Sequence, residues 1–288
     1  MYTIVGLGSV GHNIVNKFLQ YPQYNGYTID WELPEDIGNS RFIELDECEH
    51  PEEYEQSVPD LSRRFNNIEG EALFVLSGAS IISGAALRIL EYLHKKTKIN
   101  ILYIRPDMDS LSELRTLQEQ TCFKVLQEYA RSGMFESIFL VSSNMVDRML
   151  GDVTIDEYHS RFAYFVSYAV AMINYFNHSI PVVANRGETP VGCRILTLGS
   201  PLLENEQPPL NLFFPLEEIN GIHFYYGIPE NEIKDDTALL ARIKSHVRFY
   251  QQEGVSTSFS VYSTTLSEKV SFCVAYSEKV QSLSSTPG

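Results

Sequence analysis

The chain has 288 residues, 44% of them hydrophobic and 12% aromatic, so it is long enough for one large or two smaller packed domains. Its 22 Lys and Arg against 37 Asp and Glu give a net charge of −15, which argues against generic nucleic-acid binding. No apolar run approaches the roughly 20 residues of a membrane-spanning helix, and no secretory signal is visible, so we expect a cytoplasmic protein. Four widely spaced cysteines without a C-x-x-C pair predict free thiols and no metal site.

The N-terminus carries the most informative motif. An apolar strand at 2–5 runs into the sequence GLGSVGHN at 6–13, which fits the spacing G-x-G-x-x-G. Glycine lets the backbone turn tightly and approach a phosphate, and a helix that begins near Gly11 would direct its free N–H groups at the anion. A strand at 27–29 follows and ends at Asp30. These elements predict a β-α-β opening that binds a nucleotide.

Strands and helices continue to alternate up to about residue 150. The region 32–70 is rich in Glu, Asp, Pro and Asn, and we expect an irregular or edge insertion with one short apolar piece at 41–45. Nearly continuous apolar strands that alternate with helices predict a parallel sheet covered on both faces, with ligands at the carboxyl ends of the strands. The expected elements are strands at 72–76, 99–104 and 137–141, a small-residue turn at 77–86, a helix through Leu93 and a helix over about 110–129.

The second half of the chain has a different pattern. A long, aromatic-rich helix is expected from about Ile155 to Phe176, with apolar residues on more than one face. The predicted elements beyond it are strands at 194–198 and 223–226, a helix at 236–250, and a hairpin-like strand pair at 256–262 and 270–276. We therefore predict an α/β fold with a nucleotide-binding domain at 1–154, a central helix at 155–180 and a smaller α+β domain at 181–288.

This order of elements resembles that of the FtsZ and tubulin family. Residues 6–13 resemble the first phosphate loop of that family, and 74–86 resemble its signature loop. Arg105-Pro106 matches the proline that ends the next strand, 137–151 matches the strand and loop near the base, and 222–279 resembles the second domain. The resemblance implies GTP or GDP as the cofactor, with Mg²⁺, and association of copies head-to-tail into cytoskeletal filaments.

The resemblance also implies a set of nucleotide-binding residues. Tyr158 would stack on the base, Phe162 stands where the family has a polar guanine-reading residue, and Asp109 would hold the ribose. Close helix–strand packing remains the alternative for the second turn, aromatic core packing for Tyr158, and a helix cap or solvated acid for Asp109. The implied residues are Gly6, Gly8, Ser9, Gly11, His12, Asn13, Gly78, Ser83, Gly84, Asp109, Asn144, Tyr158 and Phe162. His12 would donate to a phosphate, against the alternative of a solvated residue in the first helical turn.

The chain departs from the family at the residues of hydrolysis. The signature loop of the family is a dense glycine run, whereas Ile81-Ile82 stands here, and branched side chains prevent the same close backbone approach. The family takes two acids from the loop after the central helix of a neighbouring subunit. Here Glu188 is the one candidate catalytic acid, and no second acid follows at the expected spacing. We therefore expect weak or absent GTP hydrolysis.

Two other functions remain open. The first is a nucleotide-free structural or regulatory relative of the same fold, which Ile81-Ile82 and the missing acid favour. The second is an NAD(P)-dependent oxidoreductase with a Rossmann domain, because Asp30 follows the glycine turn by about 20 residues, where dinucleotide enzymes hold a ribose hydroxyl. No His, Lys or Tyr stands in a recognisable catalytic pattern for that chemistry.

Overall fold

The chain forms two compact units. The computed structural model describes residues 2–68, 70–185, 192–201 and 210–282. Unit 1 contains Met1–Tyr168 and Val280–Gly288, and unit 2 contains Ala169–Lys279. The boundary falls inside a long helix, α6 (Ile155–Asn177), so each unit includes part of that helix. The division into three parts stated above stays a prediction.

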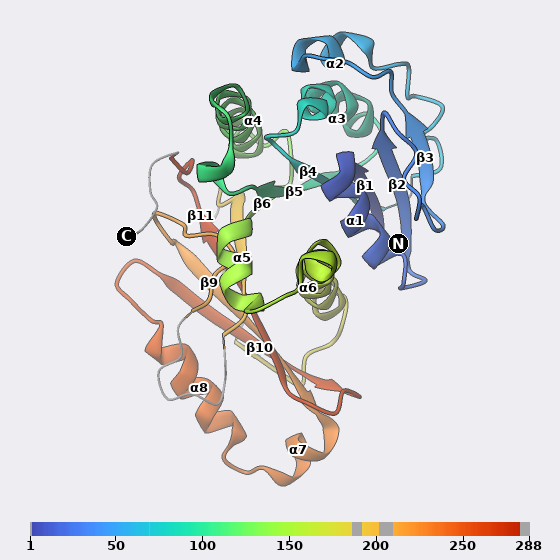
Figure 1. Ribbon diagram of the computed structural model, residues 1–288. Coiled ribbons are helices and arrows are strands. Elements are labelled where there is room, and N and C mark those ends of the chain that lie inside the picture. The colour runs from blue at the N-terminus through green and yellow to red at the C-terminus, as the bar shows by residue number, and fades with distance from the viewer. Residues whose placement is uncertain (1, 69, 186–191, 202–209, 283–288) are drawn as a thin grey trace. The chain divides into compact units, whose positions relative to one another are not determined.

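Unit 1 is built on a parallel sheet in the order β3-β2-β1-β4-β5-β6 (Figure 1). The strands are β1 (Tyr2–Leu7), β2 (Tyr24–Asp30), β3 (Arg41–Glu44), β4 (Ala72–Ser77), β5 (Ile99–Arg105) and β6 (Ser137–Ser142). The central strands are buried along nearly their whole length, as in β4, where Phe74, Val75 and Leu76 are inaccessible to solvent. Such continuous burial requires cover on both faces, which confirms the predicted α/β class with a parallel sheet.

Helices cover both faces of this sheet. Figure 1 shows α3 and α4 on one face, and α1 with the first half of α6 on the other. Lys17 of α1 donates to the Ser160 hydroxyl of α6 over 2.9 Å. The remaining helical elements of unit 1 are α1 (Gly8–Phe18), α2 (Pro51–Ser57), η1 (Ile81–Ala85), α3 (Ala86–His94), η2 (Met108–Ser110), α4 (Glu113–Arg131) and α5 (Ser143–Leu150).

The structure corrects three local expectations in unit 1. Helix α1 begins at Gly8 rather than near Gly11, because Gly8 has a φ of +71° and turns the chain within a single residue. The region 32–70 contains the expected edge strand β3 but also the helix α2. The segment after β6, expected as a loop, is the helix α5, whose Val146 is buried in unit 1.

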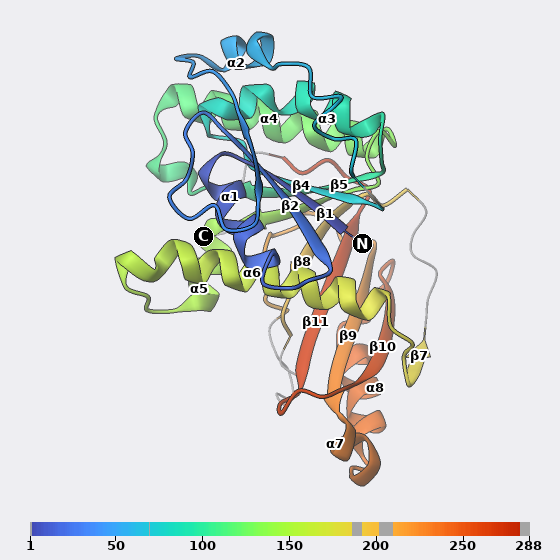
Figure 2. The ribbon, with the colours of Figure 1, turned by 90° about the vertical axis from the view of Figure 1, so that its right-hand side faces the viewer.

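Unit 2 has a mixed sheet in the order β8-β11-β9-β10-β7 (Figure 2). Its elements are β7 (Val183–Asn185), β8 (Ile195–Gly199), β9 (Gly221–Pro229), α7 (Glu230–Asp235), α8 (Leu239–Phe249), β10 (Ser256–Thr264) and β11 (Val270–Ser277). Leu239 and Ile243 of α8 pack on Phe224 and Tyr226 of β9 on one face. On the other face, Phe176 of α6 stacks on two tyrosine rings, with 4.6 Å between its ring centroid and that of Tyr262.

The predicted hairpin in unit 2 is wrong. Strands β10 and β11 do not pair with each other, because β9 lies between them, parallel to β10 and antiparallel to β11. The helices α7 and α8 connect β9 to β10, and a helical crossover of this kind returns the chain in a parallel direction. The predicted helix at 236–250 is α8, which begins at Leu239, and α7 precedes it.

The stability of unit 2 is expected to fall in mild acid because of His246. This side chain is buried, its Nδ1 lies 2.6 Å from the Tyr226 hydroxyl, and its Nε2 has no partner among the described residues. Burial lowers the pKa of His246, so the unfolded chain takes up its proton at a higher pH than the folded chain does. The neutral His246 ring makes its full contribution to the free energy of unfolding above about pH 6.5. This contribution is lost as the pH falls below that value.

Urea unfolding at a series of pH values measures this effect. We expect the free energy of unfolding to decrease below about pH 6.5 in the natural chain, and to decrease less steeply in His246→Gln, which keeps a neutral polar side chain. His94, which is exposed on α3, gives the control, and His94→Gln should follow the natural chain. Equal slopes for His246→Gln and the natural chain would show that His246 does not cause the acid sensitivity.

Candidate functional site

The first glycine turn joins β1 to α1 at the carboxyl edge of the sheet. Gly8 and Ser9 line a cavity there, and no side chain caps the helix at Leu7, so the first N–H groups of α1 remain available to an anion. Gly6 and Gly11 have a different role. A Cβ on Gly11 would lie 2.7 Å from the carbonyl carbon of Gly6, and a Cβ on Gly6 would lie 2.4 Å from that of Gly11. These two glycines let the helix cross the strand in backbone contact.

Gly11→Ala is expected to destabilise the ligand-free chain by about 1–3 kcal/mol, because the added methyl group forces α1 away from β1. The better helix propensity of alanine, worth roughly 0.5–1 kcal/mol, offsets only part of this cost. Urea unfolding without any nucleotide measures the change. Asn13→Ala, two positions further along the same helix, should change the stability by less than about 0.5 kcal/mol. Unchanged stability in Gly11→Ala would leave ligand binding as the reason for this glycine.

The second turn places its predicted residues inside the protein. Ser83 is buried, donates to the Gly78 carbonyl over 2.9 Å and accepts from the Gln118 amide over 3.0 Å. A Cβ on Gly78 would lie 1.8 Å from the Tyr103 hydroxyl, and one on Gly84 would lie 2.0 Å from the carbonyl oxygen of Pro51. The close approach of Tyr103 and α2 therefore accounts for both glycines. The residues of this turn that line the cavity are Ser80, Ile81 and Ile82.

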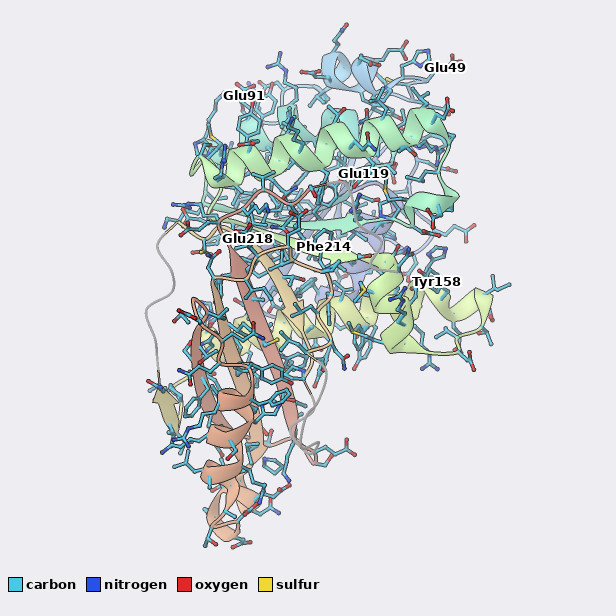
Figure 3. The ribbon with its side chains drawn as sticks, turned by 90° about the vertical axis from the view of Figure 1, so that its left-hand side faces the viewer. Glu49, Glu91, Glu119, Tyr158, Phe214 and Glu218 are labelled. Atoms are coloured by element: carbon cyan, nitrogen blue, oxygen red, sulfur yellow. The ribbon has the colours of Figure 1, made fainter. Side chains whose placement is uncertain are left out.

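The predicted base-binding residues form a separate group around α5. Tyr158, labelled in Figure 3, lies on α6. It donates to the Asp147 carboxylate over 2.8 Å, and its ring centroid lies 6.2 Å from that of Phe162. Burial and the neighbouring Asp147 raise the pKa of Tyr158. Asn144 donates to Asp107 over 2.9 Å.

The remaining predicted residues have these positions. Asp109 is exposed, and its backbone N–H donates to the Asp107 carboxylate over 3.3 Å. Asn13 is half-buried on α1, and Phe162 is buried. None of Asn13, Asp109, Asn144, Tyr158 and Phe162 is among the described residues that line the cavity. Glu188 lies outside the described residues.

The cavity has a volume of about 590 Å³ and lies where β1, β2 and β4 end. Its described walls are strongly acidic and include the guanidinium group of Arg115, in the first turn of α4. The lining residues are Gly8, Ser9, His12, Asp30, Trp31, Glu32, Leu33, Pro34, Glu35, Glu47, Cys48, Tyr54, Ser80, Ile81, Ile82 and Arg115. Sequence reasoning missed Arg115, although its place near the start of a helix that follows a buried strand was a signal for it.

Asp30 ends β2 and is buried beside the cavity. Its Oδ1 accepts from the Trp31 backbone N–H over 2.9 Å, and burial raises the pKa of its carboxyl group. His12 is also buried, with Nδ1 3.3 Å from the Thr28 hydroxyl and Nε2 3.0 Å from the Asn16 amide nitrogen. The burial of His12 argues against the solvated alternative, and His12 lines the cavity, so its donation to a phosphate stays a prediction.

Comparisons with solved structures identify the fold. A GTPγS-form protofilament of TubZ from Bacillus thuringiensis serovar israelensis has a TM-score of 0.67 and 12% identity, covering 96% of this chain and 87% of that one. An empty FtsZ dimer from M. jannaschii gives 0.68 and 10%, covering 96% and 87%. A GTPγS-bound protofilament of CetZ2 from Haloferax volcanii gives 0.69 and 11%, covering 96% and 92%. The chain therefore has the FtsZ/tubulin-like fold.

Comparisons based on the sequence alone find no match. No family model matches the chain, and no curated protein matches it. Within the described part of the chain, no helix is long and apolar enough to cross a membrane.

Proposed function

We propose that the chain binds a guanine nucleotide at the cavity of unit 1 and associates head-to-tail with copies of itself into filaments. The observation that carries this proposal is the cavity itself, which joins the uncapped start of α1 to Arg115 at the carboxyl edge of a parallel sheet. Phosphates would lie at Gly8 and Ser9 and accept from the Arg115 guanidinium. The base would extend toward Tyr158 on α6.

A Mg²⁺ ion would depend on the nucleotide. The described residues contain no group of three or more His, Cys, Asp or Glu side chains that could hold a metal by themselves. Mg²⁺ is commonly bound through phosphate oxygens with only one or two carboxylates, and the cavity is rich in carboxylates. The ion would neutralise phosphate charge beside this acidic wall.

Exposed apolar side chains around the cavity support self-association. Trp31 and Leu33 after β2, and Leu114 and Leu117 on α4, expose between 40% and 66% of their surface. Contiguous exposed apolar surface marks interaction sites, and we propose that these side chains contribute to such a surface. In unit 2, Ile180 just after α6 is 93% exposed. We propose that the segment around Ile180 of one copy covers the cavity of the next copy. The solved TubZ and CetZ2 protofilaments are the model for this contact.

Hydrolysis stays weak or absent in this proposal. The branched side chains of Ile81 and Ile82 lie at the cavity wall and would hinder close approach of a phosphate to the backbone, and Ser83 is already engaged by Gly78 and Gln118. The same observations favour the second candidate function, a nucleotide-free relative with a structural or regulatory role. The NAD(P) alternative also needs testing, because Asp30 lines the cavity together with Gly8, at the end of β2.

Fluorescence of Trp31, the one tryptophan of the chain, tests all three candidates because this side chain lines the cavity. The purified protein is titrated with GTP, GDP, ATP and NAD, with light scattering and phosphate release recorded in parallel. A saturable change with GTP and GDP but not ATP, together with rising scattering, is the expected result. A response to NAD alone would support the oxidoreductase, and no response to any ligand would support the nucleotide-free relative.

A further inference from the structure

Helix α8 of unit 2 has a basic face that points away from the core. One side of the helix is buried against β9, and the other side is exposed. The helix contains three Arg and Lys side chains and no Asp or Glu. Arg242 pairs with Asp236, which precedes the helix, whereas Lys244 and Arg248 are exposed and form no ion pair with any described residue. Two positive charges of α8 are therefore available to a partner.

Apolar side chains accompany these charges. Leu240, Lys244 and Arg248 follow one another at intervals of four residues, so they form a row along the exposed side of α8. Leu240 exposes 38% of its surface and Phe249 exposes 47%. With 3.6 residues per turn, Leu240 and Phe249 lie at the two margins of the exposed side, and the two cations lie between them. We call this surface, made of Leu240, Lys244, Arg248 and Phe249, the basic face.

Unit 1 carries the opposite charge in a single segment. Residues 31–60 contain eleven Asp and Glu against one Arg, a net charge of −10 in a chain whose total is −15. All eleven acids are exposed, and none forms an ion pair with a described residue. The segment includes β3 and α2 at the margin of unit 1 (Figure 1), and it also exposes Trp31 and Leu33. We call it the acidic segment.

The two surfaces are complementary in charge, and both contain exposed apolar side chains. Each copy of the chain carries both of them, so a second copy supplies the partner that the basic face lacks. An anionic lipid surface or a nucleic acid also attracts cations, but the net charge of −15 opposes the approach of the whole chain to either. Charge complementarity therefore favours another copy of this chain.

We propose that the basic face of α8 in one copy binds the acidic segment of another copy. The contact joins unit 2 of one copy to unit 1 of the next, so it is heterologous and can repeat from copy to copy. The inference rests on the proposed function in one respect, that copies associate, and it requires no nucleotide in the cavity. Because the charges are exposed, salt should weaken the contact.

Carbodiimide cross-linking tests the contact directly, because this reagent joins a lysine amine to a carboxylate only where the two groups touch. Equal amounts of unlabelled and isotope-labelled full-length chain are mixed before assembly, cross-linked with and without GTP, and digested. We expect linked peptides that join Lys244 to residues 31–60 and that contain one labelled and one unlabelled half. Such mixed peptides come from two copies. They should disappear in Lys244→Arg, which keeps the charge but has no reactive amine.

Sedimentation velocity of charge variants measures the strength of the contact. Lys244→Glu combined with Arg248→Glu should weaken self-association about ten-fold or more, because like charges then face each other across the contact. Lys124→Glu combined with Arg131→Glu makes the same change in net charge on exposed positions of α4, so it is the matched control. This control should remain within about two-fold of the natural chain. Raising the salt from about 0.1 M to about 1 M should weaken association of the natural chain.

Equal self-association of the charge-reversed variant and the natural chain would overturn this contact, and so would cross-links that join Lys244 only to residues outside 31–60. Both results would leave the proposed filaments in place. A natural chain that stays monomeric with GTP would contradict the contact and the filaments together. Binding to vesicles of anionic phospholipid that is lost in the variant, with self-association unchanged, would assign the basic face to a lipid surface instead.

Folding of the variants needs a separate check, which circular dichroism provides. Both substituted side chains are exposed, so we expect native spectra. Where the charge reversal fails to fold, Lys244→Gln combined with Arg248→Gln decides, since it removes the two charges without adding new ones and must still weaken self-association.

Discussion

Glu119→Ala is expected to lower the free energy of unfolding by about 3–5 kcal/mol, because it removes the buried carboxylate that faces the positive charge of Arg105. Glu119 is completely buried on α4, and its Oε1 lies 3.3 Å from Arg105 Nε. The same oxygen accepts from the Tyr103 hydroxyl over 3.2 Å, so the change also removes a hydrogen bond of a second buried side chain. Figure 3 shows Glu119 beneath the long helix α4.

Urea unfolding followed by Trp31 fluorescence measures this loss in unit 1. Glu91→Ala is the matched control, because Glu91 also pairs with Arg and Lys side chains at 2.9 Å but on the exposed surface of α3, where such pairs contribute about 0–1 kcal/mol. A loss below about 1 kcal/mol in Glu119→Ala would mean that water or another side chain replaces the carboxylate, against the geometry described for this pair.

Much of the fold could be predicted because its signals are local. The central strands of unit 1 are short apolar runs bounded by turns, and a strand that is buried on both faces leaves exactly that pattern in the sequence. The glycine spacing at 6–13 predicted the first turn, since Gly8 needs a left-handed backbone that few other residues adopt. The sequence predicts a start of α1 near Gly11, three residues later than the observed start at Gly8, because a single glycine, Gly8, is enough to make the turn.

The errors came from contacts between residues far apart in the sequence. Strands β10 and β11 are neighbours in the chain, yet β9 separates them, because the crossover through α7 and α8 makes β9 the partner of both. The partner of Ser83 is equally distant in sequence, since Gln118 lies 35 residues further on and donates to its hydroxyl, and a phosphate-binding role for Ser83 stays a prediction. No local pattern indicates either arrangement.

Helix α4 connects the stability of unit 1 to the candidate site. Arg115 lines the cavity, Gln118 holds Ser83 in the second turn, and Glu119 binds Arg105 at the end of β5. These three side chains occupy two consecutive turns of one helix, and Ser112 caps its start by accepting from the Arg115 backbone N–H. The buried ion pair therefore fixes the helix that presents the guanidinium group to the cavity.

Arg115→Ala is expected to weaken GTP binding by about ten- to a hundred-fold, the equivalent of one or two hydrogen bonds to a charged group. Arg115 is the one Arg or Lys among the described residues that line the cavity, and the carboxylates around it would otherwise repel a phosphate. Without the guanidinium group, the start of α1 alone would face the anion. Titration of Trp31 fluorescence with GTP gives the affinity.

Arg131→Ala controls for charge, because Arg131 lies in the last turn of the same helix and pairs with Glu128 at the surface. It should bind GTP as the natural chain does. Arg115→Lys should recover only part of the affinity, since an ammonium group keeps the charge but lacks the planar fork that binds two phosphate oxygens at once. Equal affinities for Arg115→Ala and the natural chain would place the phosphates away from α4, and the acidic wall would then need another explanation.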